Sequence, residues 1–142
     1  MAVRSTGRAH WEGTLFEGRG TASLESGVAG PMDVNWKARA EEKGAVTTPE
    51  ELIAAAHAAC FSMAFSNILA KNDTPPASLD VTATATFVAG EGITGMELEV
   101  NGKVEGIDRE QFEQLAETAK ENCPVSKALA GNVPISVTAS LG

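Results

Sequence analysis

The segment from Leu52 to Ala70 contains no charged residue, and it constrains the fold more than any other part of the chain. Thr48 and Glu51 stand just before it in the Thr-x-x-Glu spacing of a capping box, which marks the start of a helix. The helix is predicted to run to about Asn72, because two prolines follow shortly afterwards. A helix that is apolar nearly all round is expected at the centre of a protein rather than at its surface.

The same segment is almost long enough to cross a membrane, since nineteen helical residues span about 28 Å. It is rich in alanine and serine, however, and it contains His57 and Asn67. No cluster of basic residues flanks it to fix a membrane topology. We therefore expect a buried helix in a soluble core and no membrane partner.

Length and charge limit the classes of function. The chain has 142 residues, the usual size of one domain, and residues 1–142 are predicted to form a single domain. Its net charge is −8, from 19 acidic and 11 basic residues, which argues against nucleic acid or an anionic membrane as a partner. The N-terminal sequence MAVRSTGRAHWEG lacks the apolar stretch of a secretion signal, so a cytoplasmic location with reduced cysteines is expected.

Alternating apolar and polar residues predict strands on both sides of the long helix. The strand predicted at 33–41 places Lys37 and Arg39 on its polar face. The other strands are predicted at 8–13, 14–26, 78–90, 95–100 and 133–141, and shorter helices at 109–122 and 124–131. The pattern leaves open whether the strand at 95–100 continues past Asn101 and Gly102.

The predicted fold class is α+β, with antiparallel β-sheets packed on the long helix. One sheet covers one side of this helix, and the two short C-terminal helices cover only part of the other side. A helix that is apolar on all sides therefore predicts a second chain that completes its burial. We therefore expect an intimate homodimer. The alternative is a monomer whose own sheet wraps around the helix.

Cys60 lies in the middle of the apolar helix, where burial raises the pKa of a thiol and makes it unreactive. A reactive thiol there requires a buried cation. Arg39 is the first candidate and Arg19 the second, and Glu50 is the carboxylate that a buried guanidinium would need. Alternatively, Glu50 only complements the helix dipole at the surface. Glu50 and Cys60 lie about 15 Å apart on a straight helix, so either the helix kinks or a partner chain supplies Arg39, Glu50 or both.

Cys123 precedes Pro124 and is predicted at the N-cap of the second short helix, where free amides and the helix dipole favour a thiolate. A Cys-Pro pair at such a junction is also a plain structural device. His57 lies three residues before Cys60 and is interpreted as a packing residue. Two histidines and two cysteines without CxxC or HxxxH spacing do not indicate a metal site, so no metal and no cofactor are predicted.

Several segments resemble the osmotically inducible protein C family, which is related to the organic hydroperoxide resistance proteins. The central match is EKGAVTTPEELIAAAHAACFSMAFSNIL, the closing match contains NCPVSKAL, and GRAHWEG and LESGV resemble the family's opening. The resemblance covers essentially the whole chain and is closer to the first branch than to the second. It implies an intertwined homodimer with active sites at the interface, and a thiol-dependent peroxidase that reduces organic hydroperoxides to alcohols.

The resemblance also implies roles for individual residues. Cys60 matches the peroxidatic cysteine, Cys123 the resolving cysteine and Glu50 the family's glutamate. Arg39 matches the arginine of this branch, whereas the other branch places its arginine near Arg19. The implied cycle takes Cys60 through a sulfenic acid to a disulfide with Cys123, which a dithiol then reduces. In the related branch this dithiol is a lipoylated protein.

Two other functions are compatible with the same residues. A non-enzymatic redox-sensing or stress-response dimer would use the disulfide as a switch, and a structural domain with inert thiols would not react with peroxide while folded. The apolar residues beside Cys60 are interpreted either as a pocket for a bulky organic peroxide or as plain core; they are Phe61, Met63 and Phe65.

Overall fold

The computed structural model describes residues 1–42 and 44–142, and Lys43 lies outside the described residues. The chain forms two compact units, Met1–Leu52 and Ile53–Gly142. Each unit contains one three-stranded sheet together with helix, so the fold class is α+β as predicted. A single domain over residues 1–142 stays a prediction.

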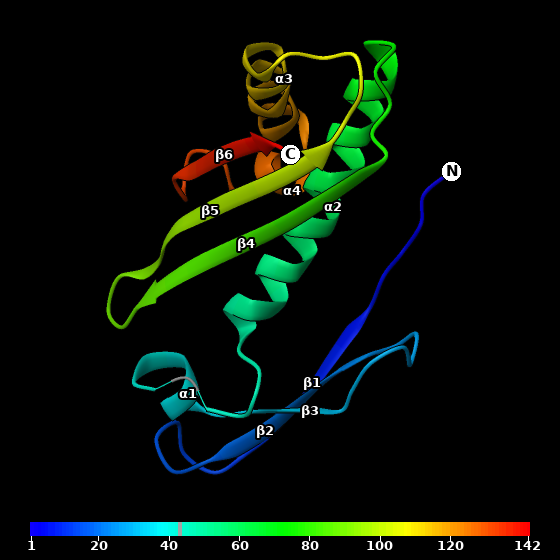
Figure 1. Cartoon of the computed structure of the whole chain (residues 1–142). Coiled ribbons are helices and arrows are strands. Elements are labelled where there is room, and N and C mark those ends of the chain that lie inside the picture. The colour runs from blue at the N-terminus through cyan, green and yellow to red at the C-terminus, as the bar shows by residue number, and fades with distance from the viewer. Residues whose placement is uncertain (43) are drawn as a thin grey trace. The chain divides into compact units, whose positions relative to one another are not determined.

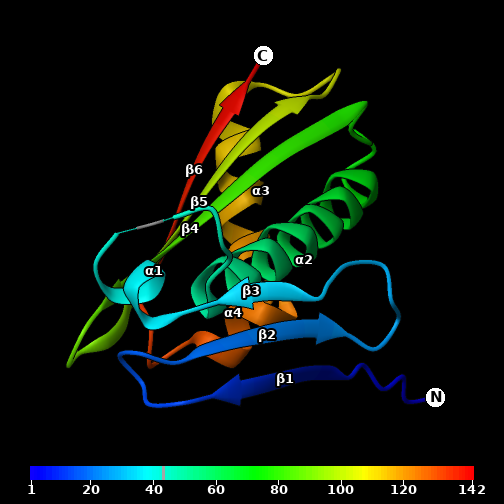
Figure 2. The same cartoon turned by 90° about the horizontal axis from the view of Figure 1, so that it is seen from below.

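The first unit contains a small antiparallel sheet followed by a short helix. In this sheet β2 (Arg19–Leu24) lies between β1 (Gly7–Glu12) and β3 (Met32–Val34), as Figure 2 shows. Both pairings are antiparallel. The helix α1 (Trp36–Ala40) follows β3 almost directly.

The prediction of one strand over residues 33–41 is wrong. The strand ends at Val34, and Asn35 caps α1 by accepting a hydrogen bond from the amide of Ala38 at 2.8 Å. Asparagine is among the best N-cap residues, and its side chain competes with strand pairing for the backbone. Arg39 therefore lies on a turn of helix and not on the face of a strand.

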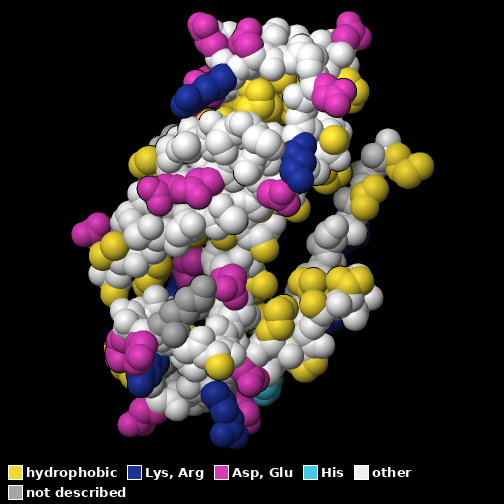
Figure 3. All heavy atoms as spheres, in the orientation of Figure 1, with side chains coloured by type: hydrophobic (Ala, Val, Ile, Leu, Met, Phe, Trp, Pro, Cys, Tyr) yellow, Lys and Arg dark blue, Asp and Glu magenta, His cyan; other side chains and the backbone are white. Residues whose placement is uncertain are grey.

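The first unit buries little of its apolar surface. Every residue of β1 is exposed, and Phe16 is 75% exposed. Other exposed apolar side chains in this unit are Val3, Trp11, Leu15, Leu24 and Val28. Figure 3 shows apolar side chains gathered along the N-terminal segment and β1. Such a short segment buries too little surface of its own to form a complete core.

Helix α2 (Pro49–Lys71) starts and ends close to the predicted positions. Thr48 is its N-cap, because the Thr48 hydroxyl accepts a hydrogen bond from the amide of Glu51 at 3.0 Å. The carboxylate of Glu51 accepts a hydrogen bond from the hydroxyl of Thr47 at 2.7 Å, which ties down the residue before the cap. By length and composition alone, α2 would also be able to span a membrane.

The second unit is built on a mixed sheet with the strand order β4-β5-β6 (Figure 1). The strands β4 (Ser78–Val88) and β5 (Gly92–Lys103) form an antiparallel hairpin, whereas β6 (Ile135–Leu141) runs parallel to β5. The predicted all-antiparallel arrangement is therefore wrong here. The helices α3 (Arg109–Asn122) and α4 (Pro124–Leu129) lie between β5 and β6 in the chain, and a crossover of this length joins parallel strands.

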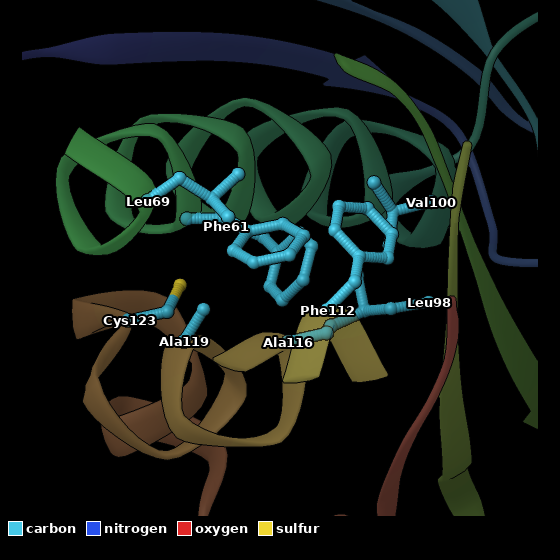
Figure 4. Packing of buried hydrophobic residues seen from close by; sticks show 9 residues of the cluster. Phe61, Leu69, Leu98, Val100, Phe112, Ala116, Ala119 and Cys123 are labelled. Atoms are coloured by element: carbon cyan, nitrogen blue, oxygen red, sulfur yellow. The ribbon is translucent and has the colours of Figure 1, made fainter. Parts of the chain in front are cut away.

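The core of the second unit lies between α2, α3 and the apolar face of the sheet, as Figure 4 shows. The ring of Phe65 lies 5.6 Å from that of Phe61 and 5.0 Å from that of Phe112, measured between centroids. A Cβ atom at Gly102 would lie 2.5 Å from the ring of Phe112, so glycine lets α3 approach β5 this closely. Phe61 and Phe65 are completely buried and are therefore core residues.

Only one face of α2 is buried within the single chain. Phe61, Phe65 and Leu69 lie on the buried face, whereas Met63 is 72% exposed. The exposed face is otherwise formed by uncharged residues: Ala55, Ala56, Ala59, Asn67 and Ala70. In the most apolar part of this helix, 28% is buried. The described residues of the second unit therefore do not bury the whole helix, although the sequence predicted that it is buried.

Candidate functional site

The two cysteines lie next to each other in the second unit although they are far apart in the sequence. Cys60 is on α2 and half-buried, and Cys123 is completely buried at the junction of α3 and α4. The Cys60 thiol donates a hydrogen bond to the sulfur of Cys123, and both residues are in the free, reduced form. In Figure 4 the sulfur of Cys123 points from this junction toward α2. The fold therefore places the two thiols in contact.

Four influences act on the pKa of the Cys60 thiol. Burial is the largest, and it raises the pKa of this thiol because a thiolate is poorly solvated there. A hydrogen bond from the backbone amide of Val125 to the sulfur lowers the pKa, since it stabilises the thiolate. The hydrogen bond to Cys123 and the repulsion between the two sulfurs raise it again. The net effect is a raised pKa, so an additional positive charge is needed to make Cys60 a thiolate near neutral pH.

The amide of Val125 is a site feature that the sequence did not indicate. Cys123 is the N-cap of α4, as predicted, but its side chain makes no capping hydrogen bond. Pro124 is the first helical residue and has no N–H, so Val125 carries the first amide of the helix. This amide serves Cys60 and not Cys123. A contact made by a backbone amide leaves no trace in residue identity, so the sequence could not reveal it.

Arg39 and Glu50 form an ion pair within the first unit. The Arg39 guanidinium donates to Oε1 of Glu50 from Nε at 2.9 Å, and its second nitrogen, Nη2, lies 2.8 Å from the same oxygen. Glu50 is buried, with 5% of its surface exposed, whereas 35% of the Arg39 side chain is exposed. Glu50 is thus the carboxylate partner of this guanidinium, and it is not a solvated first-turn acid.

The other candidate cation, Arg19, lies on β2 and its side chain is 86% exposed. Its nearest acidic partner is Glu12, with Nε 4.0 Å from a carboxylate oxygen. An exposed pair at this distance contributes little energy. Within the first unit, Arg39 is therefore much better fixed than Arg19.

His57 is a buried packing residue, as predicted, and it is also hydrogen-bonded. Its Nε2 lies 2.7 Å from the hydroxyl oxygen of Ser126 on α4. Burial lowers the pKa of His57. Within residues 1–42 and 44–142, no group of three or more His, Cys, Asp and Glu side chains is placed to hold a metal ion.

Comparisons with known proteins cover nearly the whole chain. The family model described as OsmC-like protein matches residues 42–138, a range that contains Glu50, Cys60 and Cys123. Peroxiredoxin OsmC of Escherichia coli strain K12 is 43% identical over 139 residues, which are 95% of this chain and 96% of the relative. Organic hydroperoxide resistance protein OhrA of Bacillus subtilis is 34% identical over 101 residues, which are 70% of this chain and 71% of the relative.

A solved structure supports the same relationship. The crystal structure of an organic hydroperoxide resistance protein from Elizabethkingia anophelis matches with a TM-score of 0.71 and 26% identity, and the match covers 100% of both chains. The resemblance found in the sequence is thereby confirmed. From the family model, the identities and this fold, we conclude that the chain belongs to the OsmC family.

Proposed function

We propose that this protein is a peroxide-detoxifying enzyme, a thiol-dependent peroxidase that reduces organic hydroperoxides to alcohols. The observation that carries the proposal is the contact between the Cys60 and Cys123 thiols inside an apolar core. The relatives named peroxiredoxin and organic hydroperoxide resistance protein support the same chemistry. The proposed substrate is an alkyl or aryl hydroperoxide, and the electron donor is a dithiol, for which a protein-bound lipoyl group is suitable.

In the proposed cycle the Cys60 thiolate attacks the terminal oxygen of the hydroperoxide. The O–O bond breaks, the alkoxide leaves and takes up a proton to become the alcohol, and Cys60 becomes a sulfenic acid. The Cys123 sulfur then attacks the Cys60 sulfur, so that a disulfide forms and hydroxide leaves as water after protonation. An external dithiol restores both thiols by two exchange steps and is itself oxidised to a disulfide. One peroxide is thus reduced for each dithiol consumed.

The proposed role of Arg39 is to supply the positive charge that Cys60 needs. Burial raises the pKa of Cys60, and the Val125 amide offsets this only in part. A guanidinium held by the buried Glu50 is a fixed cation of the required kind. In this proposal Glu50 orients Arg39 and limits the cost of burying its charge.

The proposed active form is a homodimer. The uncharged exposed face of α2 around Met63 and the exposed apolar residues of the first unit are two surfaces of a kind that soluble proteins cover. A second copy of the chain has the same two surfaces, so a symmetric dimer can cover both of them in each copy. This proposal favours an intertwined dimer over a monomer, and a cytoplasmic location stays a prediction.

The decisive experiment is a peroxidase assay with excess cumene hydroperoxide and dithiothreitol. Wild type should consume many equivalents of peroxide, and Cys60→Ser should consume none. Cys123→Ser, treated with peroxide without a dithiol, should gain two oxygen atoms in its intact mass, because its sulfenic acid is no longer trapped as a disulfide. Ser62→Ala is the matched control, because the Ser62 hydroxyl donates to the carbonyl of Ala59 on its own helix.

The outcomes separate the functions considered above. A wild type that stops after one equivalent of peroxide per thiol pair is a redox sensor and contradicts the enzyme proposal. A folded wild type whose thiols do not react with peroxide at all is a structural protein. Full turnover in Cys60→Ser would refute the assignment of the attacking sulfur.

A further inference from the structure

Besides the contacts made by the thiols, a buried side-chain hydrogen bond joins α2 to α4. His57 on α2 is completely buried and Ser126 on α4 is 3% exposed, and Nε2 of His57 lies 2.7 Å from Oγ of Ser126. The residues are 69 positions apart, so the bond depends entirely on the fold. Polar side chains enclosed in a core fix one relative arrangement of their elements, because any other arrangement leaves them without partners.

Each residue of this hydrogen bond lies three positions from one of the two cysteines. His57 lies three residues before Cys60, and Ser126 lies three residues after Cys123. Three helical residues advance by about 4.5 Å and return to the same side of the helix. The His57–Ser126 bond and the thiol contact therefore attach α4 to α2 at two neighbouring points. Two attachment points fix the rotation of a short helix, whereas one does not.

The direction of the bond follows from the other ring nitrogen. Nδ1 of His57 is buried and has no hydrogen-bond partner among the described residues. If Nδ1 carried the proton, a buried N–H donor would be unsatisfied, which is more costly than an unused lone pair. The favoured tautomer therefore has the proton on Nε2, and His57 donates to the Ser126 oxygen. Burial also lowers the pKa of His57, which keeps the ring neutral.

The described contact of the His57 imidazole is with α4. Its Nε2 lies against the Ser126 hydroxyl, whereas the contacts that shift the pKa of Cys60 are with the Val125 amide and the Cys123 sulfur. An effect of the His57–Ser126 bond on the thiol therefore passes through the position of α4.

We infer that the His57–Ser126 hydrogen bond is a positioning pair, which holds α4 so that the Val125 amide and the Cys123 sulfur lie against Cys60. The inference rests on the proposed function and extends it to two residues outside the thiols and the ion pair. Both contacts of Cys60 with the α3–α4 region would loosen together if the pair were broken. The attack of Cys60 on peroxide would then continue, but its sulfenic acid would wait longer for Cys123. During that time a second hydroperoxide oxidises it to a sulfinic acid and leaves as the alcohol.

The test compares Ser126→Ala with Ser126→Thr, which keeps the hydroxyl. Ser126→Ala should slow formation of the Cys60–Cys123 disulfide by roughly 3- to 10-fold, as expected for one buried hydrogen bond, and should increase sulfinic acid at Cys60. In a Cys123→Ser background, it should also move the pH profile of Cys60 alkylation to higher pH, because the Val125 amide is less well placed. Ser126→Thr should restore all three readouts in part, and Ser62→Ala should leave all three unchanged.

Disulfide formation is measured with diamide as oxidant, and alkylation with iodoacetamide, so neither measurement requires peroxidase turnover. A wild type without turnover would therefore refute the proposed function and leave this test valid. If Ser126→Ala does not fold, the double variant His57→Leu/Ser126→Ala replaces it, since removing both polar partners leaves none unsatisfied. Wild-type disulfide rates and an unshifted alkylation profile in a folded variant of either kind would overturn the inference.

Discussion

Arg39 holds a single carboxylate oxygen of Glu50 with two of its nitrogens, at 2.9 Å and 2.8 Å. This geometry belongs to a guanidinium that is fixed in direction, because Glu50 is buried and cannot turn into solvent. Burying such an ion pair costs desolvation energy, so an apolar pair of similar size would often be as stable. The two residues of this ion pair are accordingly the first to test.

Arg39→Ala should raise the pKa of the Cys60 thiol and slow its alkylation near neutral pH. The reason is that the proposed cation is lost while burial continues to oppose the thiolate. The measurement is the iodoacetamide rate against pH in the Cys123→Ser background. Arg109→Ala is the control, because it removes an exposed guanidinium that pairs with Glu113 on α3. An unchanged profile in Arg39→Ala, with a shifted one in Arg19→Ala, would transfer the role to Arg19.

Glu50→Gln should destabilise the protein more than the same change in an exposed pair. The substitution leaves the Arg39 charge without its buried partner, and because Arg39 is partly exposed the expected cost is about 1–2 kcal/mol. Glu113→Gln breaks an exposed pair of similar distance, 2.8 Å to Arg109, and should cost no more than about 0.5 kcal/mol. Urea unfolding at equal protein concentration measures both. Equal losses would mean that burial of Glu50 has no energetic consequence.

His57 should make the protein less stable as the pH falls below about 6.5. Above that pH the imidazole is neutral in the folded and the unfolded chain. Below it only the unfolded chain binds the proton, because burial lowers the pKa of His57 in the fold. The free energy of unfolding then decreases by up to about 1.4 kcal/mol per pH unit, until the pH passes the lowered pKa.

The measurement for His57 is urea unfolding at about pH 7.5 and about pH 5.5, at one protein concentration. His57→Gln should lose most of the difference between the two pH values, whereas the exposed His10→Gln should keep it. A difference that persists in full in His57→Gln would assign the pH dependence to other groups.

Gly102→Ala should destabilise the second unit by about 1–3 kcal/mol. The added methyl group would lie 2.5 Å from the ring of Phe112, which is completely buried and cannot move aside. Gly95→Ala in the same strand is the matched control, since a Cβ there meets no atom within 4 Å. Thermal unfolding of both variants checks this, and similar melting temperatures would show that α3 can move away from β5.

Met63→Asp should weaken the proposed dimer. A charge in the middle of the uncharged face of α2 would have to be buried without a partner when two copies associate. Sedimentation at several protein concentrations should show dissociation at higher concentration than for wild type. Val88→Asp, at an exposed position at the end of β4, should not change it. A wild type that is monomeric at every concentration would contradict the dimer itself.

Local signals in the sequence were sufficient for most elements of the second unit. The capping residue Thr48 predicted the start of α2. The regular alternation from Leu79 to Phe87 predicted β4 to within a few residues. The alternation around Trp36 led to the wrong prediction of a strand, because three or four alternating residues fit a strand and a helical turn equally well. The N-cap Asn35 favours the helix. The parallel pairing of β6 was missed, because a strand's own pattern does not record the direction of its neighbour. The two predicted helices between β5 and β6 were the available signal, since a crossover of this length can join parallel strands.

The candidate site also contains residues that the sequence predicted and residues that it did not. Residue types and the family resemblance indicated Cys60, Cys123, Arg39 and Glu50, and the structure adds the thiol contact and the ion pair. The role of Ser126 could not be predicted, because a lone serine in a short helix has no distinguishing pattern until the fold brings it to a buried imidazole.

Pro124 determines which backbone amide of α4 is the first available hydrogen-bond donor. Proline has no backbone N–H, so the first hydrogen-bond donor of α4 is the amide of Val125. With any other residue at position 124, the first donor would lie one residue earlier. Pro124 therefore leaves Val125 as the first backbone donor of α4, and this donor is the one that contacts the sulfur of Cys60.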